Sequence, residues 1–185
     1  IATELGQQFA LISGMGTEEA MQRLINLQQQ TSFMYGELTQ SQYRLLSAEE
    51  QRNVLLQSTT EVLDQLNTIE NKSASTMKQM TFVMNQFAAQ AHLTGESMAM
   101  MAAQSATLIE AGEEQGKAGR ALRMVYARLG SNIQDNNDKL HALGVETHDT
   151  TTGALRPLSE IVNDLAIAFE GMSLAEQQAI VQSVA

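Results

Sequence analysis

The sequence predicts an all-α fold: several amphipathic helices in helical hairpins, a bundle or extended rods, with at most a small β-hairpin near residues 145–156. Three observations predict it. Apolar residues recur at steps of three and four along most of the chain. Single glycines and helix-capping residues separate these runs. Aromatic residues make up only 4 % of the chain, which has 11 Met and no Trp, and this composition favours thin cores between closely packed helices.

Charge and length narrow the function classes. The chain has 185 residues, enough for one domain or a few extended helices, and a net charge of -10. An acidic protein is a poor ligand for nucleic acid, because phosphate contacts need clustered Lys and Arg. The chain has no Cys, which excludes disulfides and thiolate chemistry. No uninterrupted apolar run approaches the ~20 residues of a membrane-spanning helix.

Two short helices are predicted first, from Glu4 to Ser13 and from Thr17 to Gln30. The segment Gly14-Met15-Gly16 separates them, because glycine readily takes the left-handed conformation that ends a helix. Thr17 is expected to cap the second helix.

A longer helix follows and runs to about Glu70. Thr39 and Ser47 are each followed three residues later by Gln or Glu, which is the spacing of a capping box, so the helix begins at one of them. Its apolar stripe is narrow, as expected for a helix with only one or two neighbours.

The segment from Ser73 to Ala91 carries the most regular pattern in the chain. Its apolar residues alternate steps of three and four and form a helix-packing seam made of Met77, Met80, Met84, Phe87 and Ala91. Such a seam packs against another helix, either of this chain or of a second copy, and we favour an internal hairpin. Thr94 or Ser97 is expected to cap the next helix, from Met98 to Glu110.

Further helical segments, again bounded by glycines and capping residues, are predicted in the C-terminal part. Helical spacing returns after Gly116 and lasts to Gly130, and residues 133–143 are weakly helical. Pro157 suits the first position of an apolar-faced helix that ends at Gly171. Ser173 starts a capping box for a final helix, whose apolar pattern is still running at residue 185, so we expect a piece of a longer polypeptide.

Short motifs that suggest chemistry are incomplete. Residues 112–118 resemble a phosphate loop, but the spacing is one residue short and Ala118 stands where a hydroxyl must reach magnesium. Residues 95–99 resemble a nucleophile elbow without its last glycine, and residues 135–138 a calcium loop without its late Glu. The three histidines share no metal-ligand spacing. We therefore predict no enzyme, no cofactor and no metal site.

One basic cluster stands out, formed by Lys117, Arg120, Arg123 and Arg128. Glu113 lies four residues before Lys117, so part of the cluster is explained by pairing along a helix. We interpret it as structural or partner-facing charge and expect no specific nucleic-acid site.

A family resemblance adds to this reading from Met77 onward. Five runs carry it, in order: MKQMTFVMNQFAAQAHLTGESMAMMAAQSATLIEAG, KAGRALRMVYARLG, KLHALGV, TGALRPLSEIVNDLAIAF and GMSLAEQQAIVQSVA. Together they resemble the core region of tail tape-measure proteins from long-tailed, siphovirus-type bacteriophages. The motif positions are Ala111, Gly112, Ala118, Gly119, Leu122, Arg123, Gly144, Gly153, Arg156 and Pro157. The chain departs from the family at Arg120, usually Thr, and at Gln115, usually Gly.

The resemblance implies two regions: an N-terminal helical segment, residues 1–76, and a tape-measure-like core region, residues 77–185. It further implies a structural virion protein in the lumen of the phage tail, which sets tail length during assembly and is ejected before the genome. Its partners would be copies of itself, tail tube and tail-tip proteins, assembly chaperones in the host cytoplasm, and the host membrane on ejection. A helix suits a ruler, because its length grows by 1.5 Å per residue.

A second hypothesis is a helical membrane-active or secreted effector protein, suggested by the Met- and Ala-rich segment from Met98 to Ala111. A third, a muralytic enzyme, needs a catalytic constellation that the sequence lacks.

Overall fold

The computed structural model describes residues 2–130 and 134–184, and it confirms the all-α prediction. Within those ranges the chain forms ten α-helices and one short 3-10 helix, and its only β-pairing is an isolated bridge between His148 and Leu155. The elements are α1 (Ala2–Ser13), α2 (Thr17–Thr31), η1 (Phe33–Tyr35), α3 (Gln40–Leu45), α4 (Ala48–Glu70), α5 (Met77–Leu93), α6 (Met98–Glu110), α7 (Gln115–Gly130), α8 (Gln134–Ala142), α9 (Leu158–Ala168) and α10 (Leu174–Val184).

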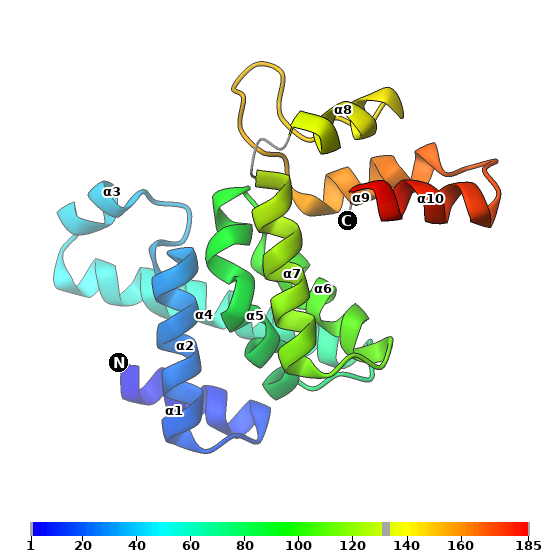
Figure 1. Ribbon diagram of the computed structural model, residues 1–185. Coiled ribbons are helices and arrows are strands. Elements are labelled where there is room, and N and C mark those ends of the chain that lie inside the picture. The colour runs from blue at the N-terminus through cyan, green and yellow to red at the C-terminus, as the bar shows by residue number, and fades with distance from the viewer. Residues whose placement is uncertain (1, 131–133, 185) are drawn as a thin grey trace.

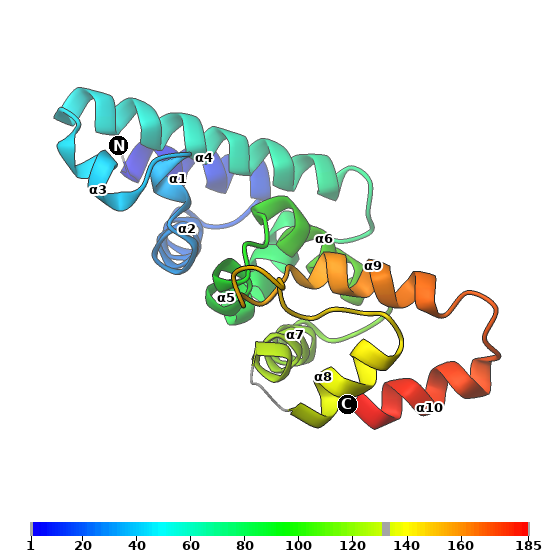
Figure 2. The same cartoon turned by 90° about the horizontal axis from the view of Figure 1, so that it is seen from above.

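Six of the first seven helices, all but the short α3, form two layers (Figures 1 and 2). Helices α2, α5 and α7 lie in a row, with α5 in the middle. Helices α1, α4 and α6 cover one side of this row, while its other side faces outward. The last three helices extend from the end of α7 as a smaller, more open unit.

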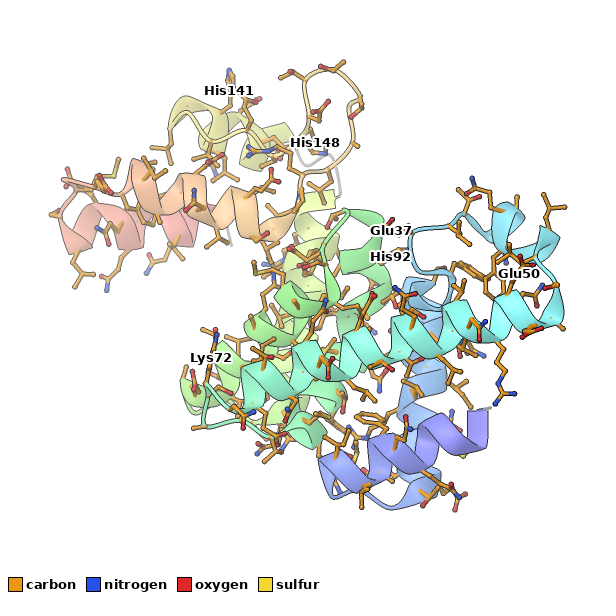
Figure 3. The ribbon with its side chains drawn as sticks, turned by 180° about the vertical axis from the view of Figure 1, so that it is seen from behind. Glu37, Glu50, Lys72, His92, His141 and His148 are labelled. Atoms are coloured by element: carbon orange, nitrogen blue, oxygen red, sulfur yellow. The ribbon has the colours of Figure 1, made fainter. Side chains whose placement is uncertain are left out.

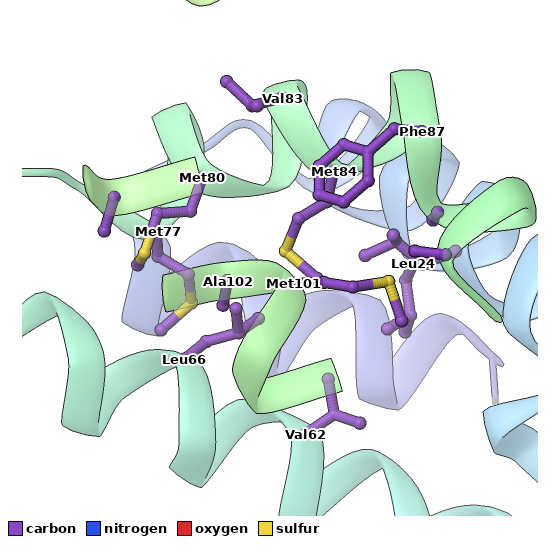
Figure 4. Packing of buried hydrophobic residues seen from close by; sticks show 14 of the residues in the cluster. Leu24, Val62, Leu66, Met77, Met80, Val83, Met84, Phe87, Met101 and Ala102 are labelled. Atoms are coloured by element: carbon purple, nitrogen blue, oxygen red, sulfur yellow. The ribbon is translucent and has the colours of Figure 1, made fainter. Parts of the chain in front are cut away.

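The main core lies between the two layers (Figure 4). Its largest fully buried side chains include Phe9, Leu27, Leu66, Phe87 and Met101, which come from both layers. Methionine fills much of the remaining space, as its flexible thioether suits irregular gaps between helices. One continuous core therefore joins helices α1, α2 and α4 to helices α5–α7.

Local capping signals explain where the helices begin. The two capping boxes predicted as alternative starts of the long helix both form: Thr39 opens α3, and Ser47 opens α4, so each begins a helix of its own. A third box, Thr76 with Gln79, opens α5. Ser97 caps α6 by accepting a hydrogen bond from the Met100 N–H at 3.1 Å, as one of the two predicted alternatives.

Two predicted helix starts differ by one residue. The N-cap of α2 is Gly16, and Thr17 is its first helical residue, without a side-chain capping bond. Pro157 is the N-cap of α9, and the helix begins at Leu158. In both cases a residue with extended φ and ψ stands just before the helix, which is how a helix entry is usually built.

The segment 145–156 is a turn with a single bridge rather than a β-hairpin with strands. The Asp149 carboxylate accepts hydrogen bonds from the N–H groups of Thr151 and Thr152, at 2.9 and 2.7 Å. Asp149 N–H donates to the Ala154 carbonyl at 2.8 Å, which closes the turn. Beneath it lies a small second core centred on Leu140, Val145 and Ile161.

None of the described helices is long and apolar enough to cross a lipid bilayer. Helix α6, the Met- and Ala-rich segment, turns Met101, Ala102 and Ala106 into the main core.

Candidate functional site

The five residues of the helix-packing seam lie in the core of the chain itself. Met77, Met80, Met84, Phe87 and Ala91 are all fully buried, against helices on both sides of α5 (Figure 4). The Phe87 ring stacks on Tyr126 of α7, with centroids 5.7 Å apart and planes 12° apart. These side chains are used within one chain, so they are not available for contacts between copies.

The Ala118-Gly119 motif sits where α5 and α7 approach each other closely. Ala118 is fully buried. A Cβ at Gly119 would lie 2.6 Å from Cδ and 2.9 Å from Cβ of Gln86 on α5. Glycine at position 119 therefore leaves the space in which the Gln86 side chain lies against α7. Leu122 continues the buried side of α7, while Arg123 points outward and is exposed.

Two of the other motif glycines end helices. Gly112 and Gly144 have φ of 88° and 78°, the left-handed region that favours glycine. At each, the next N–H bonds back to a helix carbonyl, Glu113 to Leu108 and Val145 to Leu140, both at 3.0 Å. Ala111, the motif residue before Gly112, is the C-cap of α6.

Arg156, the motif residue before Pro157, fixes the turn to α9. Its guanidinium donates to the Glu146 carbonyl and to Asp164, both at 2.8 Å, and to Glu160 at 3.2 Å. The Asp164 hydrogen bond is the main cause that raises the pKa of Arg156. Gly153, with φ of 70°, lies in the turn that this arginine holds in place.

A buried carboxylate, Glu96, joins three parts of the fold. It lies in the turn between α5 and α6 and is 5 % exposed. It accepts hydrogen bonds from the Tyr126 hydroxyl at 2.9 Å, from Gln104 at 3.3 Å, and from the hydroxyl and N–H of Ser159 at 2.8 and 3.2 Å. Ser159 lies in the first turn of α9, where the helix dipole favours a carboxylate. Glu96 thus ties α9 to the main core.

Sequence reasoning missed this residue. Glu96 lies within the incomplete nucleophile-elbow motif at residues 95–99, but that motif singles out Ser97 and gives no signal for the glutamate before it. Burial and the neighbouring Glu96 carboxylate raise the pKa of the Tyr126 hydroxyl, which keeps its proton and remains a donor. The Glu96 carboxylate is engaged by side chains from α6, α7 and α9, so we assign it a role in positioning these helices.

The histidines do not form a metal site. His92 lies on α5, away from His141 and His148 (Figure 3). His141 bonds to Glu146 at 2.6 Å, and His148 bonds to the Thr147 hydroxyl at 2.9 Å. No group of three or more His, Asp or Glu side chains with metal-binding geometry occurs in the described parts of the chain.

The comparisons with known proteins identify the family. The family of phage-related minor tail proteins matches the chain over residues 1–185, which includes the N-terminal segment that the tape-measure resemblance left uncovered. No curated protein and no solved structure matches the chain. A match over the whole length, together with an all-helical fold, settles the family. The chain belongs to the phage-related minor tail proteins.

Proposed function

We propose that this phage tail protein acts as part of a tape measure, lying in the lumen of the tail tube and leaving ahead of the genome. The observation that carries the proposal is the ordered set of glycine and arginine motifs between residues 111 and 157. The family match supports a structural role in the phage tail. The all-helical fold is compatible with a ruler, because helices convert residue number into length.

The two proposed regions have different roles in this proposal. Residues 77–185 hold the motifs, including Gly119 at the α5–α7 contact and Arg156 at the start of α9. Residues 1–76 supply helices that cover α5 and complete the main core. We propose contacts with further copies of the chain, with tail tube and tail-tip proteins and with assembly chaperones, and contact with the host membrane on ejection.

Immunogold labelling of phage particles tests the location. Antibodies against this chain should fail to label intact tails, should label tails opened by mild denaturant before ejection, and should no longer label opened tails once the genome has been ejected. A tail tube protein labelled in parallel serves as the control for accessible outer surface. Labelling along the outside of intact tails would contradict the luminal position, and absence of the chain from purified particles would contradict a virion role altogether.

A further inference from the structure

A polar groove runs along the outward face of α5, between α2 and α7. Six polar side chains line it, and we call it the amide groove: Gln30, Asn85, Gln86, Gln90, Arg120 and Arg123. Its cavity is about 370 Å³. It continues past Arg120 into a second hollow of about 500 Å³ that reaches Phe82.

The amide groove contains polar groups without partners. Arg120 and Arg123 are exposed, and neither forms an ion pair with a carboxylate in the described part of the chain. The nearby Glu114 carboxylate accepts the N–H groups of Gly116 and Lys117 instead. This leaves two guanidinium groups, each suited to bind a carboxylate through paired hydrogen bonds.

Two buried oxygens at the same groove also lack donors. Gln30 Oε1 and Asn85 Oδ1 are buried, and neither receives a hydrogen bond from the described residues. Buried acceptors are almost always satisfied in folded proteins. These two oxygens lie below the surface, out of reach of a docked partner, so the exposed arginines are the groups that a ligand can satisfy, and a pair of carboxylates fits them.

The outer face of α4 has this chemistry. A stripe at steps of four, three and four is fully solvent-facing: Gln57, Glu61, Asp64 and Thr68. Glu61 and Asp64 are three residues apart, as are Arg120 and Arg123, so the two pairs match in spacing along their helices. Glu61 accepts only a hydrogen bond from Gln57 at 3.0 Å, and Asp64 has no ion pair with any described residue.

We propose that the amide groove of one copy receives the α4 face of a second copy, with Glu61 and Asp64 pairing to Arg120 and Arg123. This inference rests on the self-association proposed above and gives it an interface. The neighbouring Gln57 amide can hydrogen-bond to the partly exposed glutamines that line the groove. Nucleic acid would also offer anions to the arginines, but its phosphates bring no amides, whereas the α4 stripe combines acids with amides.

The two faces lie on opposite sides of the molecule. Figure 2 shows α4 along one side and α7 on the other, and Figure 3 shows α4 in front when the chain is seen from behind. A contact between two different faces is heterologous, and because these faces point in opposite directions it extends from copy to copy instead of closing into a dimer or a ring. The expected assembly is a row of copies stacked through their helical layers.

A charge-swap experiment tests this interface on the whole chain. One variant, Arg120→Glu with Arg123→Glu, reverses the groove; another, Glu61→Arg with Asp64→Arg, reverses the α4 face. Sedimentation velocity over a concentration series should show open-ended association for the unmodified chain, weaker at high salt. Each variant alone should need roughly tenfold or more higher concentration to associate, because like charges then face each other.

An equimolar mixture of the two variants should associate again, since each reversed face meets its complement. A control that matches the net charge of the α4-face variant, Glu37→Arg with Glu170→Arg, alters two exposed acids outside both faces and should associate like the unmodified chain. Circular dichroism should show the same helicity for all variants.

Three outcomes would overturn the interface. An unmodified chain that stays monomeric removes self-association and the interface together. Variants that associate like the unmodified chain, or a mixture that does not recover, leave self-association standing but place it elsewhere. Binding of a short DNA duplex that Arg120→Glu with Arg123→Glu abolishes, with association unchanged, would assign the groove to nucleic acid.

Discussion

Replacing Glu96 by Ala should release the C-terminal helices α8–α10 from the main core while α1–α7 stay folded. The carboxylate accepts two short bonds from hydroxyl groups, Tyr126 at 2.9 Å and Ser159 at 2.8 Å. Hydrogen bonds to a charged group contribute about 1.5–3 kcal/mol each. Part of this loss of stability is offset, because the variant no longer has the desolvation cost of a buried charge. The expected net loss is about 2–3 kcal/mol.

The loss should be local, since the single proton of the Tyr126 hydroxyl can turn to the Gln104 side-chain oxygen at 2.9 Å and the ring remains stacked on Phe87. Amide hydrogen exchange measures the local stability of each helix separately. A loss of about 2–3 kcal/mol corresponds to exchange about 30- to 150-fold faster in α9, with α5 and α7 nearly unchanged. Glu96→Gln preserves the shape without the charge and should give a smaller change of the same pattern.

Two results would refute this reasoning. Equal loss of protection in α5 and α9 would mean that Glu96 supports the whole fold and not one junction. Unchanged exchange in α9 would mean that the bonds from Tyr126 and Ser159 contribute nothing beyond what water supplies. Ser159→Ala offers a second route, because it removes only the 2.8 Å bond from the α9 side.

Three further predictions concern packing and pH. Phe87→Ala should lower the free energy of unfolding in urea by about 3–5 kcal/mol, because the ring is fully buried; a loss under 1 kcal/mol would contradict its core role. Gly119→Ala should destabilise the fold by about 1 kcal/mol, because the clash of the new Cβ with Gln86 outweighs the gain in helix propensity. Gly116→Ala should be neutral or stabilising, because its Cβ meets only the flexible ends of a carboxylate and a guanidinium group. The reverse order of the two variants in urea unfolding would refute this prediction. Hydrogen bonds from the N-cap serines lower the pKa of Glu50 and of Glu176 below the ordinary value of 4.5. The stability that these two carboxylates add is therefore present above pH 4.5 and is lost as the pH falls through their lowered pKa. The melting temperature should fall between about pH 6 and pH 3, and it should fall less when Ser47 and Ser173 are replaced by Ala.

Much of the fold could be predicted because helix signals are local. The capping boxes at Ser47 and Ser173 and the left-handed glycines at 14 and 171 act within one or two turns of chain. The boundaries of α6 match the predicted Met98 to Glu110. Where two candidate caps competed, at Thr39 and Ser47, local rules left both open, and both are used.

The site was less predictable because it depends on which helices become neighbours. Glu96 and Ser159 are 63 residues apart, and the sequence around neither residue predicts the contact between them. The amide groove likewise joins Gln30 to Arg120 across α5, and only the layered packing brings them together. The seam at Met77–Ala91 was predicted, but its sequence alone left open whether its partner was this chain or a copy.

The compact fold changes what a ruler made of this chain would measure. The longest helix, α4, has 23 residues and is about 35 Å long, whereas 185 residues in one continuous helix would extend about 280 Å. A copy stacked through two helical layers, at about 10 Å for each layer, adds only about 20 Å. Inserting a second copy of residues 1–185 in frame in the phage gene separates these geometries by electron microscopy of tails. Lengthening by about 20 Å supports stacking of folded copies, and lengthening by about 280 Å means that the segment unfolds into a single helix in the tail. Tails of unchanged length would show that this part of the chain does not set length at all.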